Sequence, residues 1–149
     1  MGKNRKLLFK GNFKDLVVRV RYEETDRMGV VYYGNYFTYF EIGRSEFSRA
    51  SGFSYRDVEE EADVYLAVAE SWCRYLKSVS YDDEIVIRTY LNVAKPLLII
   101  FEYELFKKDN MGLFAFGYTV HIPVGSDGNK KKMPEKFLKM LRDYAEKRE

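Results

Sequence analysis

Residues 22–50 read YEETDRMGVVYYGNYFTYFEIGRSEFSRA, and this stretch decides the fold. It begins as the end of a strand, passes through a short acidic turn and becomes the strongest helical pattern of the chain. The apolar positions of the helix recur at spacings of 4, 3, 4 and 3, which is one stripe of an α-helix. These positions are Tyr36, Phe40, Gly43, Phe47 and Ala50. The pattern predicts a helix over residues 36–50 with one face against a core.

The start of this helix is the chemically interesting part of the stretch. Asn35 is a plausible N-cap, because its side chain can accept from first-turn N–H groups, and Gly52 is a natural stop. Asp26 lies just ahead of the helix N-terminus, where backbone N–H groups are unpaired and point outward. An aspartate here can be a turn or capping residue, or it can be a catalytic group. The local pattern leaves both interpretations open.

The rest of the chain supplies strands and two further helices. Strand-like patterns cover residues 15–22, 64–77, 84–94, 97–107 and 113–124. The last three are joined by short links, which predicts consecutive antiparallel strands. Ser54 caps a short helix over 54–61, and Pro134 opens a final helix to about residue 147. These elements predict an α+β protein in which an antiparallel sheet wraps around a long central helix, with an added C-terminal helix.

Length and composition fit one domain over residues 1–149 with a core of about 15–141. The 149 residues are 46% hydrophobic and 32% charged, which is typical of a globular chain. No apolar run approaches ~20 residues, so no membrane span is expected. The basic start, MGKNRKLLFKGNF, lacks the features of a signal peptide, and we expect a cytoplasmic protein.

Charge and residue counts exclude several function classes. A net charge of +2 is too small to indicate nucleic acid as a partner. The single cysteine, Cys73, excludes an internal disulfide and a cysteine-based zinc site, and no ligand cluster for another metal is visible. The single histidine, His121, is far along the chain from Asp26, and we interpret it as structural. Cys73 is interpreted as a small packed residue.

The segment YEETDRMGVVYYGNY at residues 22–36, followed by Glu41, Arg44 and Glu46 on the helix, resembles the hotdog-fold acyl-CoA thioesterases. It is most similar to the 4-hydroxybenzoyl-CoA thioesterase family, and the resemblance covers about residues 16–141. It implies a homodimer of hotdogs that share one continuous sheet and often pair into tetramers. Active sites would lie at the dimer interface. The substrates would be thioesters of coenzyme A or of acyl carrier protein, with no cofactor besides the coenzyme A of the substrate itself.

The resemblance implies that Asp26 is the catalytic aspartate. Many bacterial relatives have histidine where this chain has Tyr33, which disfavours a mechanism that requires a histidine at this position. Free N–H groups near Tyr33, Gly34 and Asn35 would polarise the thioester carbonyl. Asp26 would then attack directly or act as a general base on water, and the sequence does not separate these roles. Tyr33 can shape the acyl pocket or can be an ordinary packed aromatic residue.

Substrate-binding candidates fall into two groups. Tyr22, Val31 and Tyr32 flank Asp26 and are candidates for contact with the acyl group, although core packing explains them equally simply. The phosphates of coenzyme A call for basic side chains, although a lysine run can also be a solvated loop. The basic candidates are Lys95, Lys130, Lys131 and Lys132, with Lys77 and Arg88 as further choices.

Three alternatives remain from sequence alone. Glu41 and Arg44 are three residues apart on the helix and can form a simple ion pair, or a buried pair that steers the contact with the opposing subunit. The domain as a whole can be a non-catalytic acyl-thioester binding module. A dehydratase of the same fold is disfavoured, because that chemistry needs a histidine–acid pair.

Overall fold

The computed structural model describes residues 11–147; residues 1–10, on which the signal-peptide prediction rests, lie outside the described part. Five strands and three helices follow one another in the chain. The strands are β1 Phe13–Arg19, β2 Tyr65–Tyr75, β3 Glu84–Lys95, β4 Leu98–Lys107 and β5 Gly112–Val124. The helices are α1 Asn35–Ser51, α2 Tyr55–Ala62 and α3 Glu135–Glu146. The predicted order of elements is confirmed.

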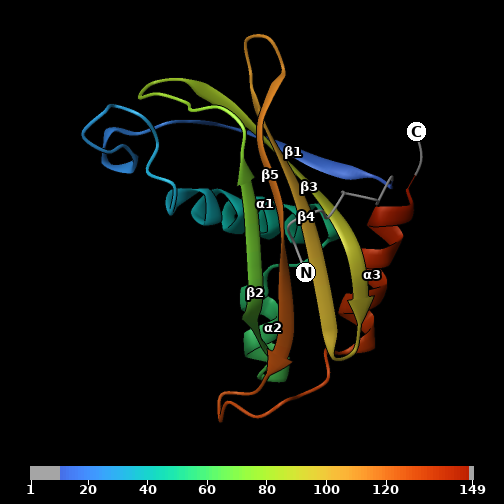
Figure 1. Cartoon of the computed structure of the whole chain (residues 1–149). Helices are drawn as coiled ribbons and strands as arrows, with labels where there is room; N and C mark the ends of the chain where they lie inside the picture. Colours follow the sequence, from blue (N-terminus) through green and yellow to red (C-terminus); the bar gives the residue numbers. More distant parts are fainter. Residues whose placement is uncertain (1–10, 148–149) are drawn as a thin grey trace.

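The strands form one antiparallel sheet in the order β1-β3-β4-β5-β2 (Figure 1). The short links predicted between β3, β4 and β5 make these strands sheet neighbours, as expected. β1 and β2 are the two edge strands. β2 is exposed along most of its length, and its outer edge has no partner strand among residues 11–147.

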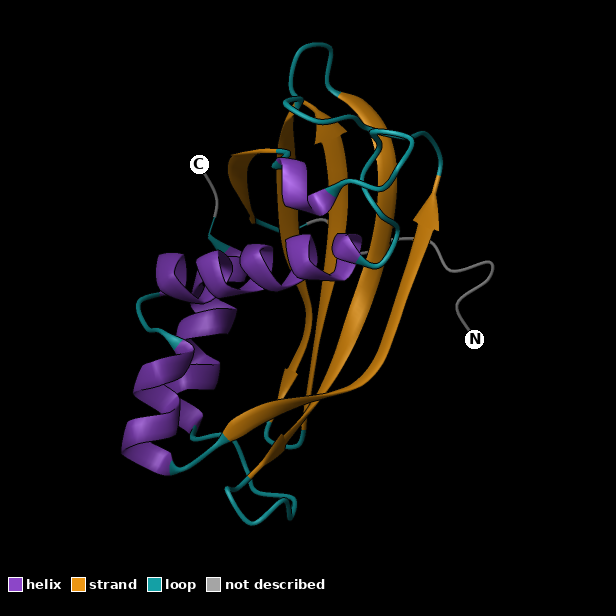
Figure 2. Ribbon diagram, turned by 90° about the vertical axis from the view of Figure 1, so that its left-hand side faces the viewer, coloured by secondary structure: helices purple, strands orange, loops and turns teal. Residues whose placement is uncertain are grey.

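Helix α1 crosses one face of the sheet, and its apolar stripe forms the centre of the core (Figure 2). Phe40 stacks on Tyr103 of β4 with ring centroids 4.2 Å apart. A Cβ at Gly43 would lie 2.4 Å from Oγ1 of Thr89 and 2.8 Å from Cγ2 of Ile87, so glycine lets β3 approach closely. The predicted stripe is correct except at its end, because Ala50 is exposed. Tyr39, which the stripe omitted, is buried at 1% exposure.

Helix α3 packs beside α1 at the end of the sheet, as Figure 1 shows. The rings of Phe47 and Tyr144 lie 5.0 Å apart, edge to face, and join the two helices. The guanidinium of Arg142 donates to the backbone carbonyl of Ala94 at 2.7 and 3.0 Å. The short helix α2 begins at the predicted cap, where Ser54 and Asp57 exchange hydrogen bonds. These contacts close the open end of the core around α1.

Two predicted boundaries are wrong, and both bear on the site. The first strand ends at Arg19, and residues Tyr22–Glu24 form a 3-10 turn because the carboxylate of Glu24 captures the N–H of Arg21. Tyr22 is therefore 78% exposed instead of ending a strand. The N-cap of α1 is Gly34 and not Asn35. The Asn35 side chain is occupied elsewhere, since it donates to the backbone carbonyl of Glu24.

Candidate functional site

Asp26 occupies a tight turn that presents its carboxylate to solvent. Its N–H donates to the carbonyl of Val30 at 2.8 Å, and its carbonyl accepts from Gly29 at 3.0 Å. Gly29 has φ +80°, a conformation that glycine adopts at no steric cost. Oδ1 accepts from the N–H of Met28 at 2.8 Å, and Oδ2 accepts no hydrogen bond from residues 11–147. The turn fixes one carboxylate oxygen and leaves the other available.

The N-terminus of α1 provides unpaired backbone donors. The N–H of Asn35 donates to Tyr32 at 2.9 Å and that of Tyr36 donates to Tyr33 at 3.3 Å, so neither is free. In the described part of the chain, the N–H groups of Tyr33 and Gly34 have no acceptor. A Cβ at Gly34 would lie 2.9 Å from Cε2 of Tyr32, so the glycine leaves room for this ring. Of the three predicted donors, two are free, and the helix dipole adds positive potential behind them.

A depression of about 300 Å³ opens beside these donors. It is lined by Val31, Tyr33, Tyr36, Tyr75, Leu76, Lys77 and Ser78. The ring of Tyr75 packs edge to face on Tyr36 with centroids 4.8 Å apart, and its hydroxyl donates to the carbonyl of Tyr33 at 3.2 Å. Thr25, the residue before Asp26, forms a β-bridge with Val31 at the edge of the depression. The predicted residues Val31 and Tyr33 therefore meet here, and the bridge ties the Asp26 turn to the same place.

The aromatic walls of the depression act as neutral groups. Burial raises the pKa of Tyr36 to about 12 and that of Tyr75 to about 12, with the neighbouring Cys73 contributing to each. Burial also raises the pKa of the Cys73 thiol to about 12, which agrees with its interpretation as a packed residue. These hydroxyls and this thiol stay protonated near neutral pH. They can donate hydrogen bonds but cannot serve as bases.

The other predicted acyl contacts lie outside the lining. Tyr22 packs its exposed ring against Tyr81 with centroids 5.8 Å apart. The rings of Tyr32 and Tyr33 have centroids 4.7 Å apart, and the hydrogen bond between the two side chains raises the pKa of Tyr32. Tyr36 and Tyr75 are pocket residues that the sequence analysis missed. Tyr36 also belongs to the helical stripe, and only the tertiary fold brings Tyr75 to it.

The predicted phosphate ligands lie at the other end of the sheet within one chain. Lys130 bridges to Val124, which is paired with Tyr65 at the start of β2, about 33 Å along the strand from Tyr75. Lys95, at the end of β3, and Lys132 are exposed, and Lys131 lies 3.5 Å from Asp63. In Figure 1 the loop after β5 lies at the bottom and the Asp26 turn at the left.

Of the two further basic candidates, Arg88 is held in an ion pair with Asp15, and Lys77 lines the depression. The guanidinium of Arg88 binds both carboxylate oxygens of Asp15, at 2.8 and 2.9 Å, and this pair raises the pKa of Arg88. Lys77 is exposed and lines the depression together with Tyr33. Within one chain, Lys77 alone of the predicted basic residues lines the depression.

Glu41 and Arg44 line a second cavity, of about 230 Å³, between α1, α2 and β2. They form no ion pair with each other among the described residues, so the simple-pair interpretation is wrong. Arg44 instead lies near His121, which is 0% exposed and donates or accepts at 2.8 Å with Thr119. Burial, with a smaller effect of Arg44, lowers the pKa of His121 to about 3. The histidine is neutral and enclosed, in agreement with a structural role.

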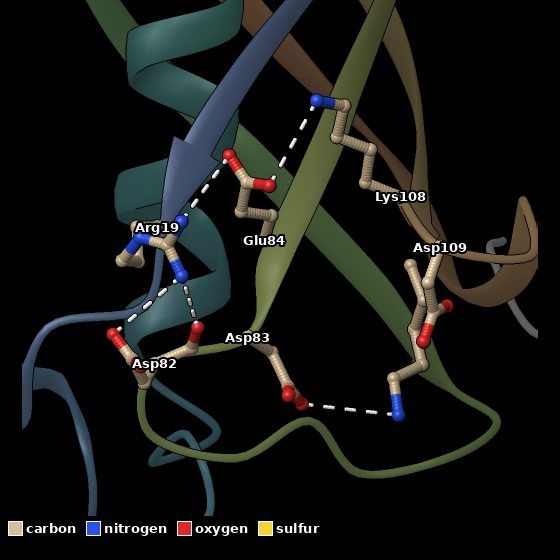
Figure 3. A pocket seen from close by; sticks show the side chains of 7 residues that line it. Arg19, Asp82, Asp83, Glu84, Lys108 and Asp109 are labelled. Carbon is tan, nitrogen blue, oxygen red and sulfur yellow. Dashed lines mark hydrogen bonds and ion pairs between the residues drawn. The ribbon is translucent and has the colours of Figure 1, made fainter.

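A third cavity, of about 360 Å³, contains none of the predicted site residues (Figure 3). Arg19 contacts Asp82 and Glu84 at 3.6 Å each, and Lys107 and Lys108 pair with Asp83 and Glu84 at 3.8 Å. Six of its seven charged lining residues pair with one another, which leaves few charges free to bind a ligand. Within residues 11–147 no group of side chains could hold a metal ion, and no helix is long and apolar enough to cross a membrane.

Comparison with known proteins identifies the family. The family model described as "Thioesterase superfamily" matches residues 28–113, beginning two residues after Asp26. This chain belongs to the thioesterase superfamily. The hotdog fold inferred from the motif is confirmed, and this member is a thioester hydrolase.

Individual relatives of this thioesterase agree with that assignment. A putative esterase of Aquifex aeolicus (strain VF5) is 33% identical over 84% of this chain and 94% of its own. A putative acyl-CoA thioesterase YneP of Bacillus subtilis (strain 168) is 32% identical over 72% of this chain and 67% of its own. The crystal structure of a DHNA-CoA thioesterase from Staphylococcus aureus superposes with a TM-score of 0.81 at 29% identity, covering 89% of this chain and 88% of its own.

Proposed function

We propose that this thioesterase hydrolyses acyl-CoA thioesters at the N-terminus of α1, with Asp26 as the catalytic carboxylate. One observation carries the proposal. Two backbone N–H groups, those of Tyr33 and Gly34, have no acceptor among residues 11–147 and belong to the same connection between β1 and α1 as an exposed carboxylate held in a tight turn. Unpaired donors beside a carboxylate are what acyl transfer from a thioester requires.

The chemistry follows from these groups. The carbonyl oxygen of the thioester accepts from the two N–H groups, which stabilise the negative charge that develops on it. In one route Oδ2 of Asp26 attacks the carbonyl carbon, the C–S bond breaks, and water then hydrolyses the mixed anhydride to the free acid and Asp26. In the other route Asp26 takes a proton from water, which attacks directly. Either way the products are a carboxylic acid and a thiol.

No histidine takes part in either route. The position seven residues after Asp26 is Tyr33, and the one histidine of the chain, His121, is 0% exposed. The nearby tyrosine hydroxyls stay protonated at neutral pH, since the pKa of both Tyr36 and Tyr75 is about 12. Asp26 is therefore the group that supplies the nucleophile or the base.

We further propose that the active unit is a homodimer and that two such dimers pair into a dimer of dimers. β2 is an edge strand with its side chains Tyr65, Val68 and Tyr75 exposed. Long exposed edges pair readily with another strand. Antiparallel pairing of β2 with its copy would carry the 130–132 lysine turn of one protomer toward the Tyr75 end of the other. There the lysines could contact the phosphates of coenzyme A.

The activity is tested with a panel of short, long and aromatic acyl-CoA esters, and with acyl carrier protein thioesters as a separate arm. Thiol release is measured for the wild-type protein and for Asp26→Ala, with Asp143→Ala on α3 as a matched exposed aspartate outside the loop. We expect turnover of at least one coenzyme A ester by the wild-type protein and by Asp143→Ala, and its loss in Asp26→Ala. Tight binding of acyl-CoA without turnover by the wild-type protein would instead indicate a binding module.

The dimer is tested by molar mass in solution. The wild-type protein should have at least twice the mass of one chain, and Val68→Lys, which places a charge on the exposed edge of β2, should shift the mass toward that of one chain. Thr38→Lys, at an exposed position on α1, is the control and should keep the wild-type mass. A monomeric wild-type protein with full activity would contradict the dimer.

A further inference from the structure

Glu24 is a buried carboxylate two residues before Asp26, and it is only 8% exposed. Three donors surround it. Oε1 accepts from the hydroxyl of Tyr39 at 2.8 Å and from the N–H of Arg21 at 2.9 Å, and Oε2 accepts from Nε of Arg21 at 3.0 Å. A buried charge is costly unless it is paired and hydrogen-bonded, and these bonds meet that requirement. The carboxylate therefore has a fixed place between the 3-10 turn and helix α1.

The main-chain carbonyl of Glu24 also contacts the start of α1 and the residues just before it. Its carbonyl oxygen accepts from the N–H of Tyr32 at 2.9 Å and from Nδ2 of Asn35 at 2.8 Å. Tyr32 and Asn35 bracket Tyr33 and Gly34, the two residues whose N–H groups are free. Glu24 thus binds α1 on both sides of the proposed donors, through its carbonyl at the first turn and through its carboxylate at Tyr39.

We propose that Glu24 is the positioning residue of this active site, which sets the separation between the Asp26 carboxylate and the N–H groups of Tyr33 and Gly34. The inference rests on the proposed function. Asp26 and the two donors belong to different segments, the turn before Val30 and the start of α1. Their geometry depends on what joins those segments, and Glu24 does so with three hydrogen bonds to α1 and its flank. Small misplacement of reacting groups is enough to reduce rates by ~100-fold.

The bond to Tyr39 is the anchor that matters most. Tyr39 is 1% exposed, and burial, together with the bond to Glu24, raises the pKa of its hydroxyl, so it stays protonated and donates. The side chain of Arg21 is 67% exposed and also contacts Glu23 at 3.0 Å. Solvent weakens such an exposed ion pair. Removal of the Tyr39 hydroxyl should therefore disturb the site more than removal of the Arg21 charge.

The test uses the variants Glu24→Ala, Glu24→Gln and Tyr39→Phe, with Glu23→Gln as the control. Glu23 is adjacent, acidic and 71% exposed, and it also pairs with Arg21. For the acyl-CoA ester that the wild-type protein turns over fastest, kcat should fall by ~30- to 100-fold in Glu24→Ala and by ~3- to 10-fold in Tyr39→Phe, with KM changed less than ~3-fold. Glu24→Gln keeps an acceptor for Tyr39 and should recover most of the lost kcat. Glu23→Gln should match the wild-type protein.

A double mutant separates positioning from general destabilisation. If Glu24 acts through Asp26, the double variant Glu24→Ala/Asp26→Asn should have a kcat less than ~3-fold below that of Asp26→Asn alone. The reason is that the group that Glu24 positions is already inactive. Full additivity, or a wild-type kcat in Glu24→Ala and Tyr39→Phe, would overturn the positioning role while leaving the catalytic role of Asp26 intact. Unchanged hydrolysis by Asp26→Asn alone would overturn the proposed function itself. Tyr39→Phe keeps the ring in the core and serves as the test if Glu24→Ala does not fold.

Discussion

The hydroxyl of Tyr75, at the end of edge strand β2, donates a 3.2 Å hydrogen bond to the backbone carbonyl of Tyr33 at the start of α1. The two rings also meet edge to face with centroids 6.3 Å apart. This contact joins the strand proposed to pair with a second protomer to the residue whose N–H is proposed to polarise the thioester. Assembly at β2 and the geometry of the donors are therefore physically connected.

The substitution Tyr75→Phe tests that connection. It keeps the ring that packs on Tyr36 and removes only the hydroxyl, so the peptide that carries the Tyr33 carbonyl loses one restraint. A neutral hydrogen bond contributes about 0.5–1.5 kcal/mol, so we expect kcat to fall by roughly 2- to 10-fold. Steady-state hydrolysis provides the measurement. Tyr81→Phe is the matched control, and equal rates in the two variants would show that the bond has no bearing on the site.

The substitution Gly34→Ala tests the free donors. The added methyl group would lie 2.9 Å from the ring of Tyr32, so the ring or the first turn of α1 must shift beside the donor N–H groups. Loss of a single such donor typically costs ~100-fold or more in kcat, and we expect at least ~10-fold from crowding it. Gly112→Ala is the control, since its methyl group meets Oδ1 of Asn110 at the same 2.9 Å in the β4–β5 hairpin. Similar kcat values for both variants would argue against donors at Gly34.

The substitution His121→Asn tests the enclosed histidine through pH. The pKa of His121 is about 3 in the folded protein, below the ~6.5 of an unfolded chain, so only the unfolded state gains a proton between these values. Its contribution to stability is complete above about pH 6.5 and is lost as pH falls toward 3, by roughly 2 to 3 kcal/mol at pH 4.5. The free energy of unfolding, measured in urea, should therefore fall more steeply between pH 6.5 and 4.5 for the wild-type protein than for the variant. Parallel curves would mean that His121 titrates normally.

Most of the fold is predictable from the sequence because its signals are local. Alternation predicts the strands, short links predict their antiparallel neighbours, and the stripe from Tyr36 to Phe47 predicts the face of α1 that is buried. The alternation continues through Tyr22 and so predicts too long a first strand, whereas the carboxylate of Glu24 accepts from the N–H of Arg21 and closes a turn there.

The site is less predictable because it depends on distances across the fold. The resemblance indicates Asp26, but only the structure shows that Asn35 is not a free donor, that Tyr75 reaches Tyr33 and that Glu24 joins the turn to the helix. The lysines at 130–132 stand out as a basic run, yet sequence spacing gives no indication that they lie at the far end of the sheet within one chain.

The most direct test of the account is single-turnover hydrolysis of an acyl-CoA ester by Asp26→Asn. The amide keeps the size of the side chain and an oxygen that can accept from Met28, so the turn and the fold should persist, as circular dichroism and thermal unfolding would show. Because the amide is neither a nucleophile nor a base, the rate should fall by at least ~100-fold. A folded Asp26→Asn protein that hydrolyses the ester at the wild-type rate would contradict the central claim.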